Sequence, residues 1–96
     1  MSFLGDWAAQ QIPKELDANA KGVEVLQRVE RWSERTAYLV MLDYLRAAAR
    51  AQRRGGVLAP GHPAACEEVR DLARRFPAHW DTPGAAVPEC APTAAP

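Results

Sequence analysis

Cysteine is scarce in this chain of 96 residues, which contains only Cys66 and Cys90. Two cysteines are too few for the disulfide framework of a small secreted domain, and in a reducing compartment both are expected to be thiols. No apolar run approaches the length of a membrane span, and the N-terminus has neither a basic leader nor an apolar signal core. The sequence therefore predicts a soluble cytoplasmic protein that does not enter a membrane.

The chain also lacks an excess of charge and the common catalytic motifs. Twelve basic residues balance twelve acidic ones, so net charge gives no reason to expect a polyanionic partner. No glycine-rich phosphate loop, Walker-type lysine or paired-carboxylate motif is present. The serines are Ser2 and Ser33, and neither these nor Cys66 has a predicted sheet beside it to build a cleft. We expect no enzymatic activity and no cofactor.

Apolar residues at three- and four-residue spacing predict an all-α fold. A short helix is expected from Ser2 to about Gln11, ended by Pro13. A long central helix is expected to begin near residue 18 and to run through 21–54, where basic residues and two glycines end it. A third helix is expected over 63–75, and we expect both shorter helices to pack on the central one.

Proline recurs throughout the C-terminal end of the chain. The segment 81–96 is rich in alanine and contains Pro83, Pro88, Pro92 and Pro96. Such a segment has too few large apolar side chains to offset the entropy lost on ordering. The sequence predicts a small helical domain over 1–80 and an extended or disordered tail over 81–96, whose removal is expected to change the melting temperature little.

The apolar face of the central helix is narrow in its first half and covers more than half the circumference between Ala37 and Ala51. A chain of this length has few elements of its own to cover such a face. We therefore expect a non-catalytic protein–protein interaction module that forms a homodimer and binds a larger protein as an accessory subunit, assembly factor or inhibitor. The expected partner-binding residues are Trp32, Tyr38, Met41, Leu42 and Leu45.

Arginines form a second feature of the same helix. On a continuous helix they would fall on one ridge, on the order of 35 Å long, made of Arg28, Arg35, Arg46, Arg50, Arg53 and Arg54. Asp43 interrupts the ridge and is placed to pair with Arg46 or Arg50. No helix-turn-helix spacing, zinc finger or aromatic platform accompanies the arginines. A small nucleic-acid-associated regulator is therefore the alternative function, less favoured than protein binding.

The histidines and cysteines all lie between residues 62 and 90, at His62, Cys66, His79 and Cys90. Four such side chains are enough for tetrahedral zinc, and His62 and Cys66 have the spacing of one helical turn. The remaining spacing fits a zinc site poorly, because the chain has no CxxC or HxxxH pair. We expect no metal, and a disulfide between Cys66 and Cys90 remains open as an alternative to two thiols.

Overall fold

The computed structural model describes residues 3–79 and 87–90, and within them the chain is helical with no strand. The elements are α1 (Phe3–Val29), α2 (Glu34–Arg53), α3 (Ala65–Arg75) and the two 3₁₀ helices η1 (Pro77–His79) and η2 (Pro88–Cys90). Helices α1, α2 and α3 all pack against one another. The predicted all-α fold is confirmed.

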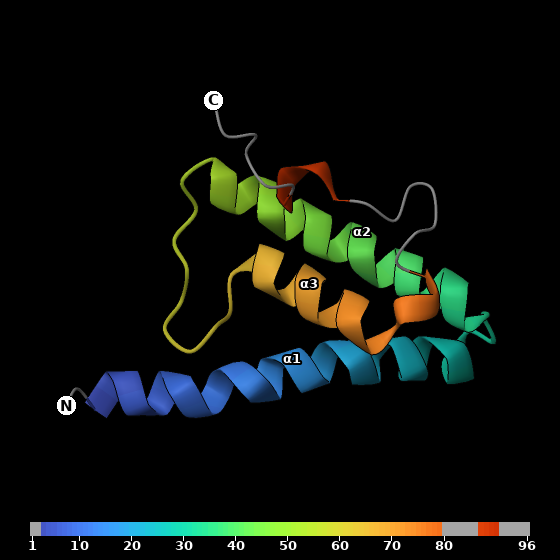
Figure 1. The fold of residues 1–96 in the computed structure, drawn as a ribbon, viewed down its shortest axis with the longest axis horizontal. Helices are drawn as coiled ribbons and strands as arrows, with labels where there is room; N and C mark the ends of the chain where they lie inside the picture. The colour runs from blue at the N-terminus through green and yellow to red at the C-terminus, as the bar shows by residue number, and fades with distance from the viewer. Residues whose placement is uncertain (1–2, 80–86, 91–96) are drawn as a thin grey trace.

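Helices α1 and α2 form an antiparallel hairpin, and α3 lies along it, parallel to α1 and antiparallel to α2 (Figure 1). The C-terminal η2 lies beside α2 and also contacts α3. The buried core draws on α1, α2, α3 and Val87, the residue before η2, with the largest share from α2. It consists of Val23, Ala37, Tyr38, Leu42, Leu45, Val69, Leu72 and Val87.

The predicted continuous helix over 21–54 is wrong, because the chain turns back between Val29 and Glu34. Arg31 in this turn has a φ of 58°, in the left-handed region, which ends α1. Ser33 is the N-cap of α2, and its Oγ accepts a hydrogen bond from the backbone N–H of Thr36 at 3.1 Å. The turn lets the second half of the predicted helix pack against the first.

The predicted end of the first helix at Pro13 is also wrong, because α1 continues through this residue. Proline has no N–H, so one hydrogen bond to the preceding turn is missing there. Pro13 and Ala9 are both exposed, so water can hydrogen-bond to the carbonyl oxygen that the proline leaves without a donor. The two helices expected over residues 2–29 are therefore one.

Candidate functional site

Three of the five expected partner-binding residues belong to the core of the chain itself. Tyr38, Leu42 and Leu45 have exposed fractions of 0%, 3% and 1%. Helix α1, helix α3 and the segment around Val87 cover them, so this part of the wide apolar face of α2 does not need a second chain for its burial. Assigning these three residues to a partner interface was wrong for this reason.

A different apolar surface remains exposed, on the side of the α1–α2 hairpin that faces away from α3. A Cβ added to Gly22 would meet Met41 Cε at 2.6 Å, which places these two residues where α1 and α2 touch. Val25 follows Gly22 by three residues and Tyr44 follows Met41 by three, so both lie beside this contact. The core residue Leu42 points to the opposite side of α2 from Tyr44, at roughly 160° by helical geometry.

We call this surface the hairpin face and define it by five side chains. They are Val25 (42% exposed), Val29 (67%), Trp32 (37%), Val40 (41%) and Tyr44 (69%). On α2 it continues along exposed Ala47 and Ala51, and exposed Asp43 lies at its edge beside Val40 and Ala47. Of the predicted partner-binding residues, Trp32 is counted with the hairpin face because it is in the turn that joins α1 to α2, and Met41, which is partly buried, lies at the edge of the face.

The arginines do not form the predicted ridge. Arg28 is at the end of α1 and Arg35 is at the start of α2, on opposite sides of the turn. Arg53 and Arg54 are exposed at the C-terminal end of α2. The predicted ridge is therefore divided, because the turn separates Arg28 from the arginines Arg35, Arg46, Arg50 and Arg53 of α2.

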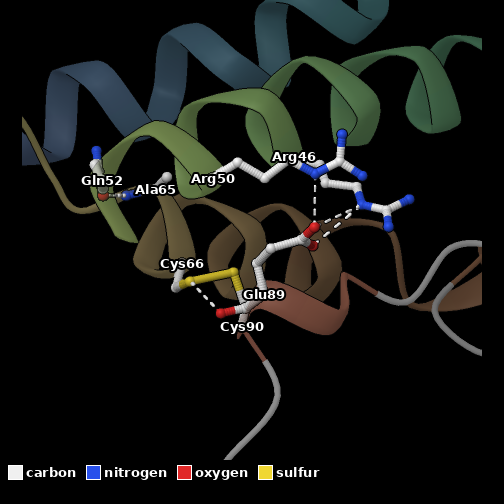
Figure 2. The surroundings of a disulfide bond; sticks show 7 residues. All are labelled: Arg46, Arg50, Gln52, Ala65, Cys66, Glu89 and Cys90. Carbon is white, nitrogen blue, oxygen red and sulfur yellow. Dashed lines mark hydrogen bonds and ion pairs between the residues drawn. A yellow bond between two sulfur atoms is a disulfide. The ribbon is translucent and has the colours of Figure 1, made fainter. Parts of the chain in front are cut away.

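Arg46 and Arg50 instead hold the carboxylate of Glu89 from η2 (Figure 2). Arg46 Nε donates to both carboxylate oxygens at 3.1 Å, and Arg50 Nε donates to Glu89 Oε1 at 2.8 Å. These hydrogen bonds, with that of Arg50 the largest cause, lower the pKa of Glu89 to about 2. The expected pairing of these arginines with Asp43 is not found in the described part of the chain.

Cys66 of α3 and Cys90 of η2 are joined by a disulfide, with their Cα atoms 5.2 Å apart (Figure 2). The expectation of two thiols is therefore wrong, and the disulfide that the sequence left open is formed. Val87 is only 8% exposed and belongs to the core. Residues 87–90 thus pack on α2 and α3 although they fall within the predicted tail, while 81–86 and 91–96 lie outside the described residues.

The four candidate metal ligands do not come together. Two of them, Cys66 and Cys90, are used in the disulfide. His79 Nε2 is 3.0 Å from Glu34 Oε1, and His62 Nδ1 donates to its neighbour's carbonyl oxygen at 2.8 Å. Among the residues described, no group of three or more histidine, cysteine or acidic side chains is arranged to hold a metal ion.

Two polar bridges that the sequence did not predict join α1 to α3. Asn19 Nδ2 donates to Glu68 Oε1 at 3.1 Å, and Arg75 donates to Asp17 at 2.7 Å and to Asp71 at 2.8 Å. Glu68 is 4% exposed, and this burial raises its pKa against the opposing effect of the Asn19 hydrogen bond. The side chains orient α3 on α1, which leaves the hairpin face uncovered on the other side.

The hydroxyl group of Tyr38 is buried without a hydrogen-bond partner in the described part of the structure. Its ring lies 5.7 Å from that of Phe76 and 5.6 Å from that of His79, centroid to centroid. Burial raises the pKa of Tyr38 because the phenolate would be poorly solvated there. Among residues 3–79 and 87–90, folding therefore buries this hydroxyl without giving it a hydrogen bond.

Replacing Tyr38 with phenylalanine is expected to raise the free energy of unfolding by about 1 kcal/mol, because the variant no longer desolvates an unpaired hydroxyl. Urea denaturation followed by circular dichroism measures the change. The matched control is Tyr44→Phe, whose hydroxyl is on a side chain 69% exposed, so its effect is expected to stay within about 0.5 kcal/mol. A less stable Tyr38→Phe variant would show that the hydroxyl has a partner after all.

No helix in the described residues is long and apolar enough to cross a membrane. No family model matches the chain, and no curated protein or solved structure shows significant similarity to it.

Proposed function

We propose that this protein is a non-catalytic interaction module of the cytoplasm, which binds other protein chains through the hairpin face. Its first partner is a second copy of the same chain, and the homodimer serves as an accessory subunit, assembly factor or inhibitor of a larger protein. The observation that carries the proposal is the exposure of Val29 and Tyr44, at 67% and 69%, on one side of the hairpin. Large apolar side chains gathered on one surface are typical of protein-binding sites.

The residue types on the hairpin face support this role. Tyrosine and tryptophan, here Tyr44 and Trp32, supply much of the binding energy in protein interfaces. The small side chains of Ala47 and Ala51 lie one turn apart on the exposed side of α2, which allows a partner helix to approach closely. A two-fold symmetric dimer would place the same stripe on both sides of the contact.

The alternative function, a nucleic-acid-associated regulator, receives less support. Its expected site was an unbroken ridge of arginines, and the turn between α1 and α2 divides that ridge. Arg46 and Arg50 are moreover engaged by Glu89. A basic surface of this kind has lost two of its central positive charges to an internal partner.

The test is the mass of the chain in solution, measured by light scattering and analytical ultracentrifugation at micromolar concentrations. We expect a dimer, and we expect Tyr44→Glu to weaken self-association by about tenfold or more because the new carboxylate would be buried in the interface. Ala59→Glu is the matched control, since it adds the same charge at an exposed position of the 54–64 connection. Both variants should keep the helical circular dichroism of the parent.

Two outcomes would contradict the proposal. A single-chain mass over the whole concentration range would show that the hairpin face does not bind a second copy. Binding of DNA or RNA tighter than about 1 μM at physiological salt, lost on neutralising Arg46, Arg50 and Arg53, would place the regulator function first.

A further inference from the structure

Arg46 and Arg50 are one turn apart on α2, and both direct Nε at the same carboxylate. Two guanidinium groups around one carboxylate form an arrangement that selects for the charge and position of that carboxylate. The carboxylate comes from Glu89, 43 and 39 residues further along the chain, and its side chain is only 12% exposed. The arginine pair is thus a carboxylate receptor on the surface of α2 that the chain fills with its own residue.

The segment that carries Glu89 is held at three points within four residues. Val87 inserts into the core with an exposed fraction of 8%. Glu89 binds the arginine pair, and Cys90 is bonded to Cys66 of α3. Of these three attachments, only the disulfide is covalent, and it is the one that a change in redox conditions breaks.

We propose that Arg46 and Arg50, with the adjacent apolar slot that holds Val87, form a binding site for an acidic peptide segment of another protein. The preferred segment has an apolar residue two positions before a carboxylate, as Val87 precedes Glu89. The chain's own segment 87–90 occupies the site as long as the Cys66–Cys90 disulfide is intact. The site lies on the other side of α2 from Tyr44, because Arg46 and Arg50 are at least 120° from that residue by helical geometry.

The opening step is thiol–disulfide exchange with an external dithiol. Both cysteines are partly exposed, so a thiolate can reach them. That thiolate attacks one sulfur and displaces the other, which takes up a proton; the second thiol of the reductant then resolves the mixed disulfide. The chain gains two electrons and two protons and becomes a pair of thiols, while the dithiol becomes a disulfide.

After reduction the segment is held by Val87 and by ion pairs to Arg46 and Arg50, whose side chains are 36% and 50% exposed. Ion pairs at such exposure contribute little to stability, so the segment exchanges between docked and free states. An acidic peptide from a partner then competes for the same arginines. In a reducing compartment, disulfides of this kind are commonly transient and redox-sensing, which fits a site that opens on reduction.

The first test follows the side-chain carboxyl of Glu89 by NMR in the full-length chain. In the oxidised chain the pKa of Glu89 is about 2, so docking of the segment favours the ionised carboxylate. The stabilisation that this carboxylate gives to the docked segment is fully present above the ordinary pKa of 4.5 and is lost as the pH falls toward 2. On reduction we expect the pKa to rise toward 4.5. A pKa that stays near 2 in the reduced chain would overturn the proposal, because the segment would still be docked.

The second test uses a terminally blocked, fluorescent peptide with the sequence of residues 85–90 and serine in place of Cys90. We expect the reduced full-length chain to bind it and the oxidised chain not to bind it. A peptide with glutamine in place of Glu89 should fail, as should the chain with Arg46→Gln and Arg50→Gln. The matched control, Arg53→Gln with Arg54→Gln, removes the same charge from the end of α2 and should bind as the parent does.

Equal binding by the oxidised and reduced chains, or equal binding of the glutamate and glutamine peptides, would overturn the proposal. So would the absence of peptide binding to the reduced chain at millimolar concentrations. Circular dichroism of the reduced chain belongs to the same experiment. A loss of helical signal on reduction would also count against the proposal, since the site on α2 would then not persist once the disulfide is broken.

Discussion

Replacing Cys66 and Cys90 together with serine is expected to lower the free energy of unfolding by about 3 kcal/mol. The disulfide joins residues 24 positions apart, and cross-linking a loop of that length restricts the unfolded chain. For a domain of this size the loss corresponds to a fall of roughly 15 °C in the melting temperature. Thermal unfolding followed by circular dichroism measures the melting temperature, and mass spectrometry counts the free thiols to show whether the disulfide is present.

The parent chain in excess dithiol should melt at the same temperature as the Cys66→Ser, Cys90→Ser variant, because both lack the cross-link. Glu89→Gln is the matched control, since it removes the charge of Glu89 from Arg46 and Arg50 and leaves the disulfide in place. The melting temperature of the Glu89→Gln variant should fall much less, because partly exposed ion pairs contribute little to stability. Equal melting temperatures for the parent and the double variant would contradict this prediction.

This result bears on the C-terminal segment, which the sequence predicts to be dispensable. That prediction followed from composition, because residues 81–96 contain Val87 as their one branched apolar side chain. The structure places this residue in the core and anchors the two residues after Pro88 to α2 and α3. The partners of Val87, Glu89 and Cys90 are distant in sequence, so no local pattern indicates them. We therefore expect deletion of residues 82–96 to destabilise the chain, against the expectation from the sequence.

Helical content was predictable because it depends on local spacing, whereas the turn between α1 and α2 was not predicted. The stripe of residues at four-residue spacing continues from Val29 through the small Ser33 to Ala37, so periodicity alone gives one helix. The available signal was Ser33 followed by Glu34, an N-cap and an acidic first-turn residue. A helix that begins at Ser33 and Glu34 also separates Arg28 from the arginines that follow.

The sequence predicts the wide apolar face of α2, but it does not indicate which elements of the chain cover the buried part of that face. Tyr38, Leu42 and Leu45 lie on that face and are buried. Helical periodicity shows that a surface must be covered, and it does not show what covers it. Here the covering elements are α1, which the turn folds back, α3, and the segment held by the disulfide. The hairpin face appears only when that folding back is known, since its residues come from both sides of the turn.

Replacing Gly61 with alanine is expected to lower the free energy of unfolding by about 3 kcal/mol. Gly61 has a φ of 78°, which is strained for any residue with a Cβ. A Cβ at this position would also run into the indole ring of Trp7, with Cη2 at 2.9 Å and Cε3 at 3.1 Å. Since the connection between α2 and α3 passes the N-terminal half of α1 here (Figure 1), the variant must move either the connection or the ring.

Gly55→Ala separates the two causes. Gly55 has a φ of 92° and nothing within 4 Å of an added Cβ in the described structure, so its substitution should cost only the backbone strain, about 1 kcal/mol. The additional loss of unfolding free energy in Gly61→Ala comes from the contact with Trp7. We expect this additional loss to be smaller when Gly61→Ala is made together with Trp7→Ala, and a double-mutant cycle in urea measures the difference. Equal losses for the two glycine variants would mean that Trp7 does not pack over the connection in solution.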